Sequence, residues 1–311
     1  MARFEGIIPA VTTPFTAADQ VDVEALKENI EKLVDAGVHG FVATGTMGEA
    51  GSLTREERAL VVRSVVEASA GRVPVSVGNS SGSARQSLEY ANDGKEAGAI
   101  GVMSLPPLGY RADDDEVVAF FAEIATCGLP VMVYNNPEAS GVDMPAQLIA
   151  RIGASVESVV AVKECSGDVR RIPALLSTTD LEILVGGDDW ALEGFCAGAT
   201  GWVSGVADVA PAECVALYEH CRAGELEAAR ELYGRLLPLA RFDMHPKLVQ
   251  YFKAAMDEVG LVGGATRPPR LPLLDHEREE LGAALARLRS SFQRPEADGR
   301  LQTAGLDAPR R

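Results

Sequence analysis

The feature that most constrains the fold of this chain is a regular alternation of short apolar segments with longer helical patterns. Eight apolar segments have the length and composition of buried strands: Gly6–Thr13, Gly40–Thr44, Pro74–Gly78, Ala99–Leu105, Pro130–Asn135, Val159–Glu164, Glu182–Gly186 and Gly201–Gly205. Amphipathic helical patterns follow these segments: Val23–Ala36, Thr54–Ala70, Ala84–Ala97, Asp113–Cys127, Pro145–Ile152, Asp168–Ser177, Asp189–Ala197 and Pro211–Arg222. Such alternation predicts an α/β protein with a parallel sheet.

The strand segments are continuously apolar, which is typical of strands buried on both faces. Eight strand–helix units in sequence predict a (β/α)8 TIM barrel, a fold that typically needs about 250 residues. An open, doubly wound sheet is the alternative. The glycine-rich dinucleotide-binding motif of many such sheets is absent after the first strand, so we expect the barrel.

Three further helical patterns follow the eighth unit, at Glu225–Leu239, Lys247–Val259 and Asp275–Arg289. They are too long for a loop and predict a helical C-terminal extension packed on the barrel. We therefore expect a catalytic barrel over residues 1–222 and the extension over residues 223–292. Residues 293–311 are rich in Pro, Gly, Ala and charged residues, a composition that predicts a disordered tail.

Composition excludes several classes of function. The chain has 311 residues and a net charge of −16, which argues against nucleic-acid binding. No apolar run reaches the roughly 18 residues that cross a membrane, and the N-terminus lacks the apolar core of a signal peptide. We therefore expect a cytoplasmic protein. The five cysteines and four histidines are scattered, so we expect neither a disulfide framework nor a metal site.

Lys163 is the residue that first suggests catalysis. It is one of only six lysines and interrupts the apolar run of residues 158–163. A cation in such a run is costly unless it is paired or loses its charge. A neutral lysine is a nucleophile that can condense with a keto group. The alternative is a structural lysine that pairs with Glu164 or another carboxylate.

Tyr134 ends the preceding strand segment at a height equivalent to that of Lys163. Catalytic groups of TIM barrels lie at the C-terminal ends of the strands, so the hydroxyl is expected near the lysine amine. A tyrosine can donate and accept the protons that imine chemistry requires. The alternative is a core tyrosine whose hydroxyl only satisfies a hydrogen bond.

Two glycine-rich turns follow other strands. In Gly45–Glu49, glycines on either side of Thr46 suggest backbone N–H groups that turn toward an anion, although an ordinary βα turn gives the same pattern. After Gly186 and Gly187, we interpret Asp188 and Asp189 mainly as caps of the next helix.

Taken together, four motifs in order along the chain resemble the dihydrodipicolinate synthase/N-acetylneuraminate lyase superfamily of class I, Schiff-base (β/α)8 enzymes. The motifs are Gly45–Glu49, Tyr134–Pro137, Val162–Glu164 and Gly186–Asp189, and the resemblance covers residues 6–273. The resemblance implies a homotetramer that acts on a small keto acid or cyclic imine and needs no cofactor.

The same resemblance implies roles for individual residues. Lys163 would form the imine and Tyr134 would transfer protons. Thr46 and the backbone at Met47 would hold the substrate carboxylate, and Val203 would line the keto-acid pocket. Tyr110 and Arg111 lie in a loop with an apparent insertion, so no role is carried over to them.

Two departures from the synthases narrow the expected reaction. Dihydrodipicolinate synthases usually have a second threonine, part of a proton relay, where this chain has Met47. They also use an arginine that grips the aldehyde substrate's carboxylate where this chain has Ala139. A thioether cannot relay a proton and an alanine cannot bind a carboxylate, so the synthase reaction is not the one we expect first.

Other segments are similar to Δ1-pyrroline-4-hydroxy-2-carboxylate deaminases of hydroxyproline breakdown, in which a bulky apolar residue also replaces the second threonine. These segments are Tyr134–Pro137, Gly141–Asp143, Lys163–Arg171, Gly201–Val203 and Lys247–Gln250. The expected reaction is therefore dehydration and deamination of the pyrroline to 2,5-dioxopentanoate. The alternatives are a dehydratase or aldolase of 2-keto-3-deoxy sugar acids, 4-hydroxy-tetrahydrodipicolinate synthase, a non-catalytic barrel that binds keto acids, and a metal-dependent class II aldolase.

Overall fold

The computed structural model describes residues 4–290 and has the predicted (β/α)8 TIM-barrel fold. Its strands are β1 (Gly6–Pro9), β2 (Phe41–Ala43), β3 (Val75–Gly78), β4 (Gly101–Ser104), β5 (Val131–Asn135), β6 (Val159–Glu164), β7 (Glu182–Val185) and β8 (Gly201–Ser204). All neighbouring strands are parallel. Strand segments predicted from apolar runs are thus confirmed, several of them one to four residues shorter.

The sheet closes on itself. The hydrogen-bonded strand order is β1-β8-β7-β6-β5-β4-β3-β2. A parallel bridge between Ala10 and Val42 joins the two edges, beside β1 and in β2. The Val11 N–H donates to the Val42 carbonyl across this junction at 3.0 Å. Nearly every strand residue is buried, which explains why the strands are apolar on both faces.

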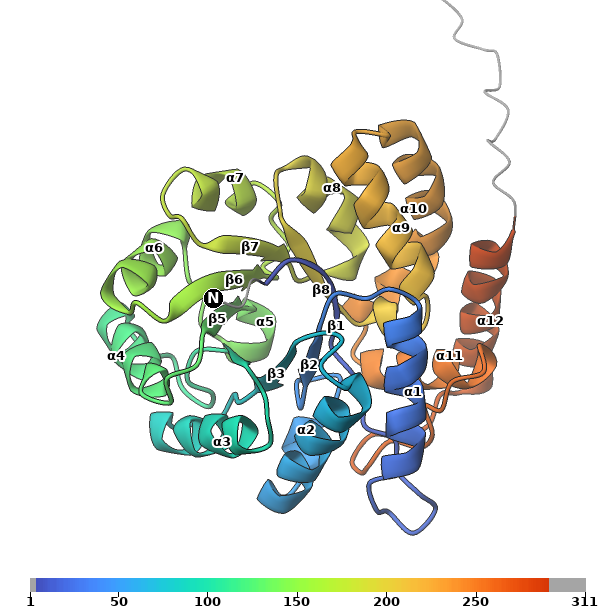
Figure 1. Ribbon diagram of the computed structural model, residues 1–311. Helices are drawn as coiled ribbons and strands as arrows, with labels where there is room; N and C mark the ends of the chain where they lie inside the picture. Colours follow the sequence, from blue (N-terminus) through green and yellow to red (C-terminus); the bar gives the residue numbers. More distant parts are fainter. Residues whose placement is uncertain (1–3, 291–311) are drawn as a thin grey trace, which may run out of the picture.

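Helices surround the strands (Figure 1). The α-helices are α1 (Val23–Asp35), α2 (Arg55–Ser69), α3 (Ala84–Glu96), α4 (Asp114–Ala125), α5 (Pro137–Ser140), α6 (Ala146–Ser155), α7 (Arg171–Leu176), α8 (Ala191–Cys196), α9 (Pro211–Ala223), α10 (Leu226–Ala240), α11 (Leu248–Glu258) and α12 (Asp275–Arg289). Short 3₁₀ turns are η1 (Ala50–Ser52), η2 (Asp188–Trp190), η3 (Val206–Asp208) and η4 (Arg241–Met244). Within residues 4–290, no helix combines the length and apolar character needed to cross a bilayer.

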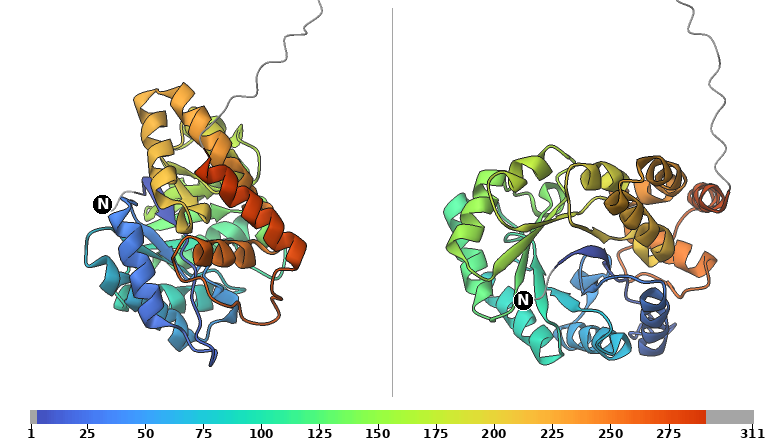
Figure 2. Two further views of the ribbon diagram at one scale, coloured as in Figure 1. Left: turned by 90° about the vertical axis from the view of Figure 1, so that its right-hand side faces the viewer. Right: turned by 45° about the horizontal axis from the view of Figure 1, so that its top comes forward.

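The last three helices form the predicted C-terminal extension. Helices α10, α11 and α12 lie together on one side of the barrel, and α10 packs against α9 and α12 (Figure 2). The segment that joins α10 to α11 contains η4 and reaches the open end of the barrel. The tail predicted for residues 293–311 lies outside the described residues.

Candidate active site

A cavity of about 220 Å³ opens at the C-terminal ends of the strands. Its walls come from the turn after β2, from β5 and α5, from β6, and from the segment between α10 and α11. This is the end of the barrel at which TIM-barrel enzymes carry their active sites. The cavity brings Lys163, Tyr134, Thr46 and Met47 to one place, as the sequence predicted.

Lys163 extends into this cavity from the end of β6. Its side chain is largely buried, with 6% exposed, and its Nζ lies 4.2 Å from the centre of the Tyr134 ring. Among the described residues, no carboxylate lies within ion-pair distance of the amine. Glu164 instead accepts hydrogen bonds from Asn135 Nδ2 at 2.9 Å and Ser166 N at 2.7 Å. The alternative of a structural pair with Glu164 is therefore wrong.

Glycine at the end of β7 gives the lysine its space. A Cβ at Gly186 would lie 2.9 Å from Lys163 Cε and 2.6 Å from Cys165 Cβ. Any larger residue at this position would therefore displace the lysine stem or the neighbouring thiol.

Tyr134 lies beside Lys163 because the two residues are register partners on β5 and β6. The tyrosine hydroxyl accepts a hydrogen bond from Asn136 Nδ2 at 3.0 Å. Burial raises the pKa of Tyr134 well above its usual value, so the hydroxyl holds its proton at neutral pH. It can therefore donate a proton to a group bound at the lysine.

The turn after β2 contains two backbone donors without a protein acceptor beside the cavity. Thr46 and Met47 both line it, and in the described chain their N–H groups donate to no other protein group. The local geometry differs from the predicted one, because the left-handed residues are Thr44 (φ 56°) and Glu49 (φ 54°) rather than the glycines. Gly48 is needed for close packing, since a Cβ there would lie 3.0 Å from the Val11 carbonyl oxygen.

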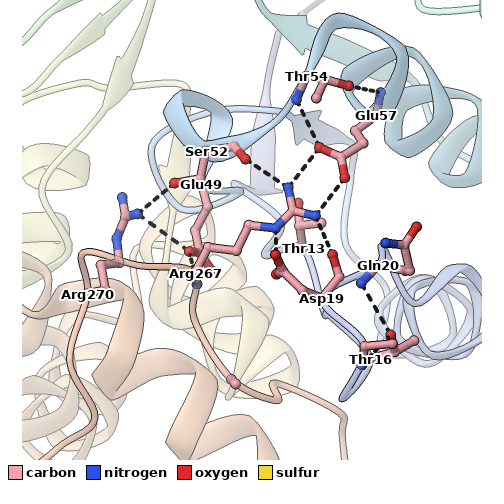
Figure 3. A network of polar contacts seen from close by, with 12 residues as sticks. Thr13, Thr16, Asp19, Gln20, Glu49, Ser52, Thr54, Glu57, Arg267 and Arg270 are labelled. Carbon is pink, nitrogen blue, oxygen red and sulfur yellow. Dashed lines mark hydrogen bonds and ion pairs between the residues drawn. The ribbon is translucent and has the colours of Figure 1, made fainter.

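A buried polar network holds this turn against the C-terminal extension (Figure 3). Glu49 is fully buried and accepts hydrogen bonds from Lys253 Nζ at 2.9 Å and Arg267 N at 3.0 Å. Lys253, on α11, also donates to the Thr13 carbonyl at 2.9 Å. Arg267 continues the network to Glu57 through two bonds of 2.6 and 2.7 Å. The position of the two N–H donors thus depends on residues more than 200 positions later in the chain.

The extension also supplies polar groups that the sequence analysis missed. Asp243 and His245 line the cavity from the segment between α10 and α11. Asp243 Oδ2 accepts a hydrogen bond from Asp188 N at 3.1 Å. Burial raises the pKa of Asp243 to about 6, although the charge of Lys163 acts in the opposite direction. The only available signal was the presence of two polar residues, Asp243 and His245, between two helical patterns.

Asp188 and Asp189 do not cap the following helix, so that interpretation is wrong. Both lie in η2, and α8 begins at Ala191, after Trp190, without a side-chain cap. The Asp188 carboxylate is fully buried and accepts hydrogen bonds from Trp202 Nε1 at 2.9 Å and Val206 N at 2.6 Å. It therefore joins the end of β7 to β8.

Of the other positions discussed from the sequence, one lines the cavity and the others do not. Ala139 lines it from α5, a helix of one turn where the sequence predicted only a loop. At the end of β8 the wall is formed by Gly205, whereas Val203 is buried two residues earlier in the strand. Tyr110, in the loop after β4, is 49% exposed. The role of Val203 stays a prediction.

Comparison with known proteins gives one family. The model of the dihydrodipicolinate synthetase family matches residues 3–288. A 4-hydroxy-tetrahydrodipicolinate synthase from Methanoculleus marisnigri is 34% identical over 287 residues, which cover 89% of this chain and 96% of that enzyme. The enzyme of the same name from Methanopyrus kandleri is also 34% identical, over 92% of this chain and 97% of its own length.

Solved structures agree with this assignment. The crystal structure of dihydrodipicolinate synthase DapA-2 from Bacillus anthracis is similar to this fold with a TM-score of 0.88 and 30% identity. The similarity covers 92% of this chain and 99% of that one.

Proposed function

Because the chain belongs to the dihydrodipicolinate synthetase family, we propose that it is a class I lyase in which Lys163 forms an imine with a 2-keto acid or its cyclic equivalent. The observation that carries this proposal is the position of the Lys163 amine, which extends into the cavity over the Tyr134 ring with no carboxylate paired to it among the described residues. An amine that is not held in an ion pair can approach and attack a carbonyl carbon.

The surrounding groups have complementary tasks in this chemistry. The N–H groups of Thr46 and Met47 bind the substrate carboxylate, since unpaired backbone donors in a turn form an anion site. The Tyr134 hydroxyl moves protons between the substrate and the lysine nitrogen. Formation of the imine makes the adjacent C3–H acidic, because the nitrogen accepts the electron pair that remains.

Within this class, we propose that the substrate is Δ1-pyrroline-4-hydroxy-2-carboxylate. The side chains that line the cavity support a substrate with one carboxylate. The side chains of Met47 and Ala139 offer no group that binds a second anion, and Glu138 adds an acidic side chain to the lining. A second carboxylate beside Glu138 would be repelled, whereas the amine released on ring opening would be attracted.

The reaction then proceeds in balanced steps. Lys163 adds to C2 of the pyrroline, and cleavage of the C2–N1 bond leaves the lysine imine and a free amine on C5. Tyr134, having given its proton to N1 as the C2–N1 bond breaks, accepts a C3 proton, and the resulting enamine expels the C4 hydroxyl as water. Tautomerisation places an imine at C5. One water hydrolyses that imine to release ammonia, and a second releases 2,5-dioxopentanoate from Lys163.

A second candidate is 4-hydroxy-tetrahydrodipicolinate synthase, which the names of the relatives favour. It would use the same lysine and tyrosine, but it requires a site for the carboxylate of the aldehyde substrate. A dehydratase or aldolase of 2-keto-3-deoxy sugar acids also fits the lysine and tyrosine, and no observation of the structure favours it over these two.

Parallel assays of the purified protein test the choice of substrate. One assay follows 2,5-dioxopentanoate and ammonia from the pyrroline, and the other follows condensation of pyruvate with the aldehyde that the synthases use. We expect turnover of the pyrroline at least 100-fold more efficient than the condensation. Efficient condensation without turnover of the pyrroline would show that the deaminase proposal is wrong and the synthase is right.

A further inference from the structure

Asp243 occupies an unusual place for a carboxylate. It belongs to η4 in the C-terminal extension, yet it lines the cavity that contains Lys163 and Tyr134. One oxygen, Oδ2, accepts the Asp188 N–H at 3.1 Å, and this bond fixes the side chain against the end of β7. Among the described residues, Asp243 has no ion-pair partner that would explain its presence as a structural charge.

Asp243 is surrounded by titratable groups whose charges act on its carboxyl group. The groups that interact with it electrostatically come from β5, β6 and η2: Tyr134, Lys163, Cys165, Asp188 and Asp189. Burial raises the pKa of Tyr134, Cys165 and Asp188 above the usual values of these groups. Of the acidic groups of the cavity with a perturbed pKa, Asp243 is the one that titrates closest to neutrality, at about 6.

The proposed reaction contains a step that needs such a group. Expulsion of hydroxide from C4 is slow unless an acid protonates the oxygen as the C–O bond breaks. Tyr134 is already committed to the C3 proton, next to the lysine. The acid for C4 must therefore lie further along the cavity wall, and its pKa should be near the working pH.

We propose that Asp243 is the general acid that donates a proton to the hydroxyl leaving C4 of the lysine-bound substrate. The electron pair of the enamine moves to form the C3=C4 bond and restores the iminium at C2. The C4–O bond breaks, water departs and Asp243 is left as a carboxylate. Solvent returns its proton before the next cycle. This assignment rests on the proposed deaminase function.

His245 also lines the cavity, but its position suits this task less well. Its Nδ1 accepts the Lys247 N–H at 3.0 Å, and its ring packs edge-on against Tyr251 with the centroids 4.9 Å apart. Asp243, by contrast, is the residue of this segment whose charge interacts with Lys163 and Tyr134.

The variant Asp243→Asn tests the assignment, because an amide still accepts the Asp188 N–H but cannot act as an acid. With the pyrroline as substrate, we expect kcat to fall about 100-fold or more with little change in KM. In the wild type, kcat/KM should decrease as the pH rises through about 6, since the acid of the free enzyme loses its proton. That dependence should be absent from the variant and partly restored in Asp243→Glu. Asp275→Asn, at an exposed carboxylate of the same extension, is the matched control and should behave as the wild type.

Trapping with borohydride separates a catalytic role from a structural one. During incubation with the pyrroline, Asp243→Asn should accumulate a reduced adduct on Lys163 that is heavier by one water than the dehydrated adduct. If the wild type turns over the pyrroline and the variant has the same kcat and pH dependence, the role of Asp243 is overturned and the deaminase proposal stands. A variant that traps no pyruvate would also overturn this role, since the defect would then precede water loss. A wild type that traps pyruvate but does not turn over the pyrroline would overturn both proposals.

Discussion

At the scale of single residues, the site depends on how a buried cation is accommodated. Lys163 lies at the end of an apolar strand, where burial of an unpaired ammonium is unfavourable. The face of the Tyr134 ring, 4.2 Å from the amine, supplies a weak attraction of about 0.5–2 kcal/mol. This contact positions the amine in the cavity without an ion-pair partner among the described residues, which is the arrangement that we propose for imine formation.

The variant Tyr134→Phe separates the two contributions of this tyrosine. The ring that supports Lys163 is kept, and the hydroxyl that we propose transfers protons is lost. Because Asn136 is the only protein group that donates to this hydroxyl among the described residues, the fold should be unaffected. We expect imine trapping to persist while turnover falls by about 10²–10⁴-fold. Turnover within a factor of two of the wild type would exclude Tyr134 as the proton-transfer group.

At the scale of elements, the turn after β2 and helix α11 form one unit. The Glu49–Lys253 pair that joins them is almost completely buried, with side-chain exposures of 0% and 1%. Removal of one partner from a buried pair typically costs about 3–5 kcal/mol. Without Lys253, the buried Glu49 would keep Arg270 Nη1, at the longer distance of 3.4 Å, as its charged partner. The pair therefore contributes both to stability and to the position of the N–H donors of Thr46 and Met47.

We expect Lys253→Met to lower the free energy of unfolding by about 3–5 kcal/mol in urea titrations and to raise KM for the keto-acid substrate. The matched control is Lys27→Met, which removes a surface pair with Glu67 whose side chains are 32% and 54% exposed. Such a pair contributes less than about 1 kcal/mol. Equal losses in the two variants would contradict the anchoring role of Lys253.

The elements differ in how well they could be predicted from the sequence. The strands and the longer helices could be placed closely, because continuous apolar runs and helical periodicity are local signals. Helix α5 was missed because four residues are too few to show a period. Lys163 and Tyr134 could be brought together because parallel strands end at one edge. Asp243 could not be assigned to the site from the sequence. It lies more than 30 residues after the end of β8, and its place beside the cavity depends on how α10 packs against the rest of the molecule.

At the scale of the whole molecule, the barrel and the extension act together in the site. Strand ends provide the lysine and the tyrosine, and the extension lines the cavity and anchors the turn after β2, which we propose binds the substrate carboxylate. The resemblance to the wider superfamily also predicts a homotetramer. Light scattering should therefore give a mass of about four times the 32.8 kDa of one chain. A single species at the mass of one chain, across micromolar concentrations, would contradict this prediction.

The measurement that tests the central claim most directly is reduction of the protein with borohydride in the presence of pyruvate, followed by peptide mapping by mass spectrometry. We predict a single stable adduct on Lys163, and no adduct in the variant Lys163→Ala with its fold intact by circular dichroism. The other lysines serve as internal controls in the same digest. An unmodified Lys163 in the wild-type protein, or an adduct on another lysine that survives in Lys163→Ala, would contradict the claim that Lys163 forms the imine.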